Sequence, residues 1–173
     1  MTSFGKKYNI EYKHNNDLIQ KLDNKIQILK NKRNKKRCRK RTINKYENKK
    51  SNLIDELHWK TINDILLEND YIFYGDIKSH NIVKHGKNKN LNKDFNNLKF
   101  YLFKQRLIFK TAERNKQIYI IGENFTTKTC SNCGNITNIG NSKIYNCKKC
   151  NCIFDRDFNA AKNILMKGIT SNL

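Results

Sequence analysis

The chain has 173 residues, a formal net charge of +21 and a mean hydropathy of -0.86. Its length predicts one domain with a small appendage, and no segment is long and apolar enough to span a membrane. The excess of basic residues indicates a polyanionic partner, most simply nucleic acid, although A/T-rich codon usage could account for much of the lysine and leave only a solvated basic surface.

The first half of the chain predicts a basic helical hairpin over about residues 16–68. A short strand is expected at residues 4–12, and helical spacing of apolar residues follows from Leu18 to Leu29 and again from Ile43 to Leu66. Residues 30–50 hold twelve basic side chains and one acid, at or near the bend. The nucleic-acid-binding residues are expected in this stretch, namely Lys32, Arg33, Lys35, Lys36, Arg37, Arg39, Lys40 and Arg41.

The second half alternates between strands and helices. Apolar runs predict buried strands at residues 71–77 and 118–122, separated by a helix at about 93–115. A final helix is expected from about 158 to 167, with Phe158, Ala161 and Leu165 on one face and Gly168 as its stop. This order favours an α/β fold with a partly parallel sheet, although two or three strands are few for such a sheet.

Two Cys-x-x-Cys pairs, thirteen residues apart, predict a zinc ribbon at residues 127–153. Each turn needs a left-handed residue directly after it, and Gly134 and Asn151 tolerate that conformation. Four thiolates leave no open coordination position, so the zinc would be structural. Cys152 is expected to point away from the metal, although an exchange with Cys150 as the ligand stays open. The expected ligands are Cys130, Cys133, Cys147 and Cys150.

Four acids are candidates for a second, divalent-cation site. Asp155 and Asp157 precede the final helix, where an aspartate commonly serves as an N-cap and nothing more. Hydrolysis of a phosphodiester by two metal ions needs several carboxylates from different elements. Glu123 directly follows the second strand, and Asp76 lies at the end of the first. Ligands gather at the C-terminal ends of parallel strands, although either acid could be an ordinary strand-end residue.

The segments ENFTTKTCSNCG, YNCKKC and DRDFNAAKNILMKG resemble TnpB-type proteins, the transposon-encoded RNA-guided DNA endonucleases, and their Fanzor relatives. The resemblance covers about residues 10–170. It implies a partial RNase H-like (RuvC-type) α/β fold with an inserted zinc ribbon. Residues 1–126 would be the partial RuvC region with the basic hairpin, 127–153 the ribbon and 154–173 the C-terminal RuvC helix.

The resemblance also implies roles for the acids in a three-carboxylate, two-metal site. Asp157 matches the third carboxylate, and Asp155 is the second choice. The usual position of the second carboxylate holds Gly75, with Asp76 after it, whereas Glu123 matches a rearranged, Fanzor-like branch. The first carboxylate, in a G-x-D-x-G strand, has no counterpart here.

The sequence is therefore expected to be a TnpB-like transposase or DNA endonuclease fragment that binds nucleic acid and is inactive alone. The expected cofactors are a structural Zn²⁺ and, for an intact site, Mg²⁺. The expected partners are DNA, a guide RNA and a separate N-terminal polypeptide, in an intracellular setting such as a nucleus or viral factory. The alternative is a stand-alone zinc-ribbon adaptor for DNA or protein.

Overall fold

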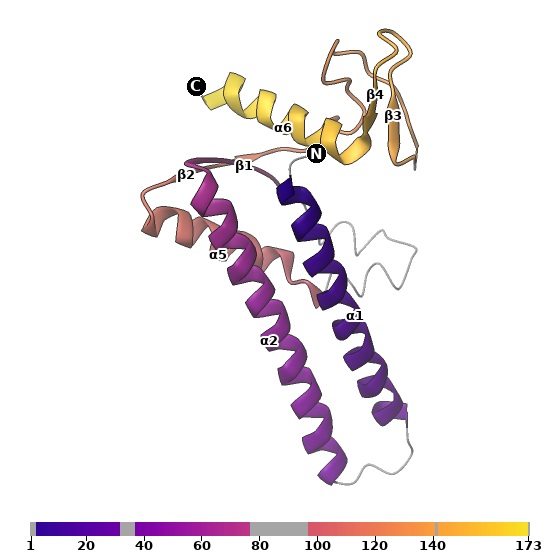
Figure 1. The fold of residues 1–173 in the computed structure, drawn as a ribbon, viewed down its shortest axis with the longest axis vertical. Coiled ribbons are helices and arrows are strands. Elements are labelled where there is room, and N and C mark those ends of the chain that lie inside the picture. Colours follow the sequence, from indigo (N-terminus) through magenta and orange to yellow (C-terminus); the bar gives the residue numbers. More distant parts are fainter. Residues whose placement is uncertain (1–2, 32–36, 77–96, 141, 173) are drawn as a thin grey trace. The chain divides into compact units, whose positions relative to one another are not determined.

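The computed structural model describes residues 3–31, 37–76, 97–140 and 142–172 (Figure 1). These residues fall into two compact units, residues 1–67 and 68–173. Within the described ranges, none of the helices combines the length and the apolar character that crossing a bilayer requires. The chain mixes helices and strands, as the α/β expectation requires at its coarsest level.

Two long antiparallel helices form the first unit. They are α1 (Ser3–Asn31) and α2 (Arg37–Glu68). Their direction follows from two ion pairs, because Lys30 contacts Glu47 and Asp23 contacts Lys50, each at 2.8 Å. Ile19, Leu22 and Ile26 of α1 and Ile54 and Ile62 of α2 are buried, as their helical spacing predicts.

The strand predicted at residues 4–12 is wrong, because α1 begins at Ser3. Asn15, Asn16 and Asp17 separate this segment from the helical spacing that begins at Leu18, but they do not interrupt the helix. Adding residues to an existing helix is more favourable than starting a separate strand that has no neighbour to pair with. Sequence alternation over a few residues is therefore overridden by the helix that follows it.

The predicted nucleic-acid-binding residues are described only in part. Lys32, Arg33, Lys35 and Lys36 lie outside the described residues, as does the side chain of Arg37. Arg39 is half-buried on α2, and Lys40 and Arg41 on the same helix are exposed to solvent.

The second unit contains a two-stranded parallel sheet. Strand β1 (Tyr71–Gly75) pairs with β2 (Gln117–Ile121), so that Tyr71 lies opposite Gln117 and Gly75 opposite Ile121. Helix α5 (Phe100–Glu113) lies between the two strands and begins later than the helix expected at about 93–115, of which residues 93–96 lie outside the described ranges; α6 (Arg156–Asn172) packs against both strands. Both predicted strands and their parallel pairing are thereby confirmed.

The two faces of this sheet carry different helices. On the α6 face, Gly168 approaches the ring of Phe73, and Ile164 approaches Gly75. On the α5 face, Tyr74 contacts the ring of Phe103, with 6.4 Å between ring centroids. Because side chains alternate between faces along a strand, the residues that follow each strand are assigned to a face by the same alternation.

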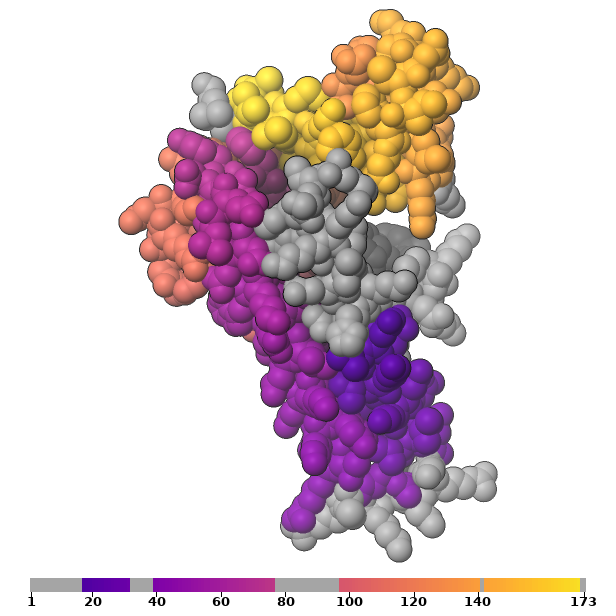
Figure 2. Space-filling model, viewed as in Figure 1, coloured from indigo at the N-terminus to yellow at the C-terminus, as the bar shows by residue number. Residues whose placement is uncertain are grey.

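Strand β2 leads through a turn into the cysteine segment (residues 127–153), which is followed by α6. Strands β3 (Ile144–Asn146) and β4 (Ile153–Asp155) pair antiparallel. Tyr145, fully buried, forms the centre of this segment, and its hydroxyl lies 3.0 Å from the carbonyl of Lys128 and 3.1 Å from that of Asn135. The space-filling view shows the segment, in orange, continuous with the yellow surface of α6 (Figure 2).

The final helix differs from the prediction in length and in its buried face. It continues to Asn172, and Gly168 is not its stop. A Cβ atom at position 168 would lie 2.1 Å from Phe73 Cδ1, so glycine here permits close packing on the strand. The face with Phe158 and Leu165 is exposed, whereas Asn159 and Asn163 are buried. Hydrogen bonds to backbone carbonyls, described below, explain why polar side chains occupy the buried face.

Candidate metal centre and acidic sheet edge

Four cysteine sulfurs converge in the cysteine segment. The Sγ atoms of Cys130, Cys133, Cys147 and Cys150 all lie within 4.8 Å of one another. Among the described residues they are the only cluster of three or more cysteine, histidine or acidic ligand atoms this close together. Cys130 and Cys150 are 3.7 Å apart at sulfur, and Cys133 and Cys147 are 3.5 Å apart. A tetrahedral zinc ion with sulfurs at about 2.3 Å requires S···S separations of about 3.8 Å, and these two separations are near that value.

The two tight turns have the backbone that the spacing predicts. Gly134 and Asn151 adopt φ angles of 72° and 56°, in the left-handed region. In each turn the amide of that residue donates to the carbonyl of the first cysteine of its pair, Cys130 or Cys147, at 2.9 Å. The prediction for both positions is confirmed.

The thiols differ in acidity even without a metal. A hydrogen bond from the Cys152 backbone amide, more than any other influence, lowers the pKa of Cys150 to about 6. At Cys133 the backbone amide of Asn135 also acts to lower the pKa, but burial and the neighbouring thiols outweigh it and raise the pKa to about 12. Zinc is bound by deprotonated cysteines, so a zinc ion at this cluster must displace the protons of the less acidic thiols.

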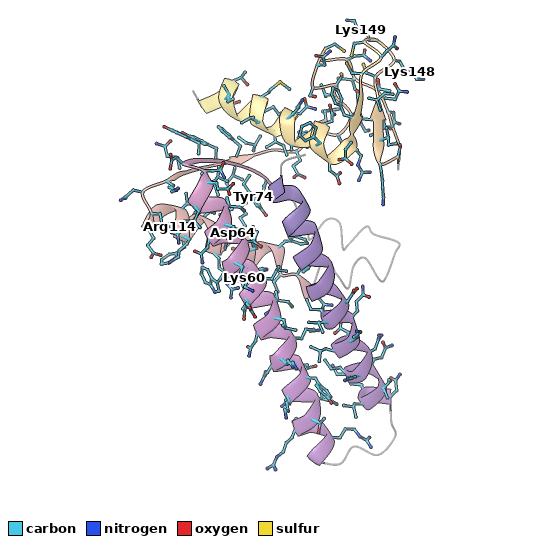
Figure 3. All side chains as sticks on the ribbon, in the orientation of Figure 1. Lys60, Asp64, Tyr74, Arg114, Lys148 and Lys149 are labelled. Carbon is cyan, nitrogen blue, oxygen red and sulfur yellow. The ribbon has the colours of Figure 1, made fainter. Side chains whose placement is uncertain are left out.

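Cys152 lies next to this cluster and is not part of it. Its sulfur accepts a hydrogen bond from Asn132 Nδ2 at 3.4 Å, and its carbonyl accepts from the amide of Cys147 at 3.0 Å. Cys152 thus holds the second turn through its backbone. Lys148 and Lys149 project at the outer end of the segment, where both are exposed (Figure 3).

The two aspartates at the start of α6 have different roles. Asp155 Oδ1 accepts hydrogen bonds from the backbone amides of Asp157 at 2.9 Å and Phe158 at 3.0 Å, so Asp155 is the N-cap. The side chain of Asp157 is 83% exposed and is contacted by Arg156 Nε at 3.2 Å. Of the two, Asp157 has the carboxylate that remains open to a ligand.

Glu123 lies on the α6 face of the sheet, two residues beyond β2. A Cβ atom built on Gly75 would lie 2.3 Å from Glu123 Oε1 and 3.0 Å from Ile164 Cδ1. The carboxylate thus rests directly over the glycine that ends β1. Burial, and then the charge of Asp76, raise the pKa of Glu123. Burial, and then the charges of Glu123 and Asp76, also raise the pKa of Tyr74, which is labelled in Figure 3.

Asp76 also lies at this edge of the sheet, but it is neutralised from the opposite side. Lys104 of α5 contacts Asp76 Oδ1 at 2.6 Å, and the amide of Asp76 continues the sheet by donating to Ile121 at 2.8 Å. The alternation of side chains directs Asp76 toward α5, because Tyr74, two residues earlier, faces Phe103. Asp76 therefore forms a structural ion pair with Lys104 at the same edge of the sheet, on the face away from α6.

Asp157 and Glu123 are related through the packing of α6 on β1. Gly168 lies at Phe73 and Ile164 at Gly75, so the N-terminal part of α6 extends past the C-terminal end of the strand. Asp157 precedes Ile164 by seven residues, which is two turns on the same side of the helix and roughly 10 Å along its axis. By this spacing Asp157 lies beyond the strand end, about two helical turns from the residue of α6 that packs at Gly75, and neither acid is part of a cluster of three ligands among the described residues.

Sequence reasoning missed the buried asparagines of α6. Asn159 and Asn163 are 0% and 5% exposed, and both donate hydrogen bonds to the segment that connects Glu123 to the first cysteines. The signal was present as two polar residues four apart on one helix face, opposite Phe158 and Leu165.

Comparison with known proteins finds a family model and relatives that resemble this chain. Residues 100–164 match the Cas12f1-like TNB domain family. A TnpB-like protein of Acanthamoeba polyphaga mimivirus is 35% identical over 156 residues, which are 86% of this chain and 30% of that protein. The CRISPR-associated endodeoxyribonuclease Cas12f1 of Sulfoacidibacillus thermotolerans is 34% identical over 76 residues, which are 42% of this chain and 18% of that protein.

The fold also has a solved counterpart. A chain in the cryo-EM structure of a Cas12f1-sgRNA-target DNA complex superimposes with a TM-score of 0.59 at 21% sequence identity, covering 84% of this chain and 40% of that chain. This chain spans about a third of the length of the mimivirus relative. The chain is therefore similar in sequence to TnpB-like proteins over most of its length, and it shares its fold with the matched part of the Cas12f1 complex chain.

Proposed function

We propose that this chain is part of the nuclease region of a TnpB-like, RNA-guided DNA endonuclease, with a RuvC-type fold and a zinc ribbon. One observation carries the proposal. Glu123 rests over Gly75 on the face of the sheet where α6 packs, and the exposed carboxylate of Asp157 is on the side of α6 that also carries Ile164, the residue that approaches Gly75. Two acids from distant parts of the sequence are thereby directed to one region beyond the ends of parallel strands, where such folds bind their ligands.

Carboxylate oxygens are the ligands that Mg²⁺ prefers, so the donor chemistry at this edge fits that ion. When bound in pairs, such ions stabilise both the attacking and the leaving oxygen of an in-line displacement at phosphorus. Glu123 and Asp157 would hold the ions. Asp76 is the weaker candidate, because Lys104 contacts its carboxylate at 2.6 Å and its side chain is only 34% exposed, whereas Arg156 contacts Asp157 at 3.2 Å and leaves that side chain 83% exposed.

The zinc ion would be held by Cys130, Cys133, Cys147 and Cys150 and would supply structure only, because four thiolates complete its coordination. The alternative of a stand-alone adaptor is disfavoured by the packing of the segment. Asn159 of α6 donates to Thr129 at 2.7 Å, and Arg156 donates to Lys143 at 2.9 Å, so the cysteine segment and the helix are one hydrogen-bonded body.

The described residues supply two open acids at this edge. Two ions held by two carboxylates bind weakly and lose alignment, and a misplacement of about 1 Å commonly lowers a rate about 100-fold. We therefore propose that the isolated chain binds nucleic acid without cutting it efficiently, and that a further polypeptide segment supplies the third acid. DNA and a guide RNA are the proposed partners.

Two assays on the purified, zinc-loaded chain test this function. In the first, labelled DNA is incubated with Mg²⁺, and the proposal expects no appreciable cleavage by the chain alone. If the chain did cut DNA, and Asp157→Asn abolished the cleavage whereas Glu123→Gln did not, the assignment of Glu123 would be overturned. Efficient cleavage that required both acids would overturn the need for a third.

The second assay is a titration of DNA binding against salt. Each lysine or arginine that neutralises a phosphate contributes about 0.9 to the slope of log affinity against log salt on duplex DNA. Lys40→Gln and Arg41→Gln are expected to reduce the slope. Lys60→Gln is the matched control, because Lys60 on the same helix is already paired with Glu56 at 3.1 Å. A slope near zero for the unmodified chain would overturn the nucleic-acid proposal.

A further inference from the structure

The two buried asparagines of α6 have almost no access to water. Asn159 is 0% exposed and Asn163 is 5% exposed. A buried amide destabilises a fold unless its donors and acceptor find partners. Their partners therefore reveal what the buried face of α6 is built to hold.

Both side chains bind the backbone between Glu123 and the first pair of cysteines. Asn163 Nδ2 donates to the carbonyls of Thr126 at 2.8 Å and Thr129 at 2.7 Å. Asn159 Nδ2 also donates to Thr129, at 2.7 Å, and Asn159 Oδ1 accepts from the amide of Ser131 at 2.9 Å. Asn163 thus uses two donors, whereas Asn159 uses a donor and an acceptor.

These contacts continue to both functional regions. Thr126 donates twice to the carbonyl of Glu123, from its amide at 3.2 Å and from Oγ1 at 2.8 Å. Ser131 lies inside the turn between Cys130 and Cys133, whose sulfurs belong to the thiol cluster. Asn159 itself follows Asp157 by two residues in the first turns of α6.

We propose that Asn159 and Asn163 are positioning residues that join Glu123, Asp157 and the first cysteine turn into one rigid body. The inference rests on the proposed function, in which Glu123 and Asp157 hold divalent cations. Its new content is that the distance between the two acids is fixed by the side-chain amides of α6. The four-cysteine cluster, when it holds zinc, orders the Thr126–Ser131 segment to which those amides are hydrogen-bonded.

Aspartate substitutions separate the two asparagines, because the side chains are nearly the same size. Asn163→Asp loses both donors and places an anion against two carbonyl oxygens. Asn159→Asp loses one donor and keeps the acceptor for Ser131. Asn138→Asp is the matched control, because Asn138 is exposed and, within the described part of the chain, accepts a hydrogen bond from Gly140 at 3.3 Å, which aspartate retains.

The experiment measures three quantities on each purified full chain: bound zinc, Mn²⁺ affinity by electron paramagnetic resonance, and amide hydrogen exchange. Substitution of a residue that hydrogen-bonds to a metal ligand typically lowers metal affinity by about 10–100-fold. We expect Asn163→Asp to retain zinc, to weaken Mn²⁺ binding about 10-fold or more, and to accelerate exchange of the Thr126–Ser131 amides. Asn159→Asp should have a smaller effect of the same kind, and Asn138→Asp none.

Retention of wild-type Mn²⁺ affinity and exchange rates in Asn163→Asp would overturn the proposal. If that variant fails to fold, Thr126→Val removes only the hydroxyl that donates to Glu123 and must weaken Mn²⁺ binding while zinc is retained, or the proposal is wrong. If Glu123→Gln, made as a single substitution, binds Mn²⁺ as tightly as the wild-type chain does, the proposed function fails instead. In that case, faster amide hydrogen exchange in Asn163→Asp but not in Asn138→Asp would still support the role of the asparagines in holding the segment rigid.

Discussion

Gly75→Ala should separate the geometry of the acidic edge from the stability of the fold. The added Cβ atom would lie 2.3 Å from Glu123 Oε1, so the carboxylate must retreat by about 1 Å to reach an ordinary contact distance of 3.4 Å. A glutamate side chain makes this movement easily, and alanine is favoured over glycine in a strand by about 0.5–1 kcal/mol. The free energy of unfolding should therefore stay the same or rise slightly, whereas Glu123 loses its position.

The assay compares Mn²⁺ affinity and urea unfolding in the zinc-loaded chain. Gly75→Ala should bind Mn²⁺ about 10-fold more weakly, in line with the effect of disturbing the surroundings of a metal ligand. Gly122→Ala is the control, because a Cβ atom there meets nothing within 4 Å and lies one residue from the same carboxylate. Wild-type Mn²⁺ affinity in Gly75→Ala, or a clear loss of its stability, would refute the reasoning.

Three further predictions concern α6 and the thiol cluster. Gly168→Ala should lower the free energy of unfolding by about 1–3 kcal/mol in urea titrations, because its Cβ atom would lie 2.1 Å from the ring of Phe73, which is less free to move than a carboxylate; unchanged stability would contradict this packing. Asp155→Ala should lose about 0.5–2 kcal/mol as an N-cap, whereas Asp157→Ala should lose less, and the reverse order by the same titration would exchange their roles. Zinc affinity should fall as pH falls, because protons compete with the metal for all four thiolates, so an affinity measured with a chromogenic chelator that did not change with pH would contradict the ligand set.

The cysteine segment was the most predictable part of the chain. Zinc geometry restricts ligand spacing and turn conformation together, so the pairs Cys130–Cys133 and Cys147–Cys150 specified left-handed residues at Gly134 and Asn151. The parallel pairing of β1 and β2 was predictable for a similar reason, because a connecting helix favours a parallel crossover.

The misses have a common physical cause. Apolar periodicity assigned Phe158 and Leu165 to one face of a helix, but it could not show that the opposite face is buried through Asn159 and Asn163. Their burial depends on the carbonyls of a distant segment, which no local pattern encodes. Likewise, only the packing of Glu123 over Gly75 shows which face of the sheet that acid occupies.

The central claim is that Glu123 and Asp157 contribute to one divalent-cation site. A double-mutant cycle in Mn²⁺ affinity, with Glu123→Gln, Asp157→Asn and the double variant of the zinc-loaded chain, tests it most directly. The account predicts that each single variant weakens binding about 10-fold or more and that the double variant is little weaker than either one, because residues that act on the same ion are not additive. Additive losses, or wild-type affinity in either single variant, would contradict it.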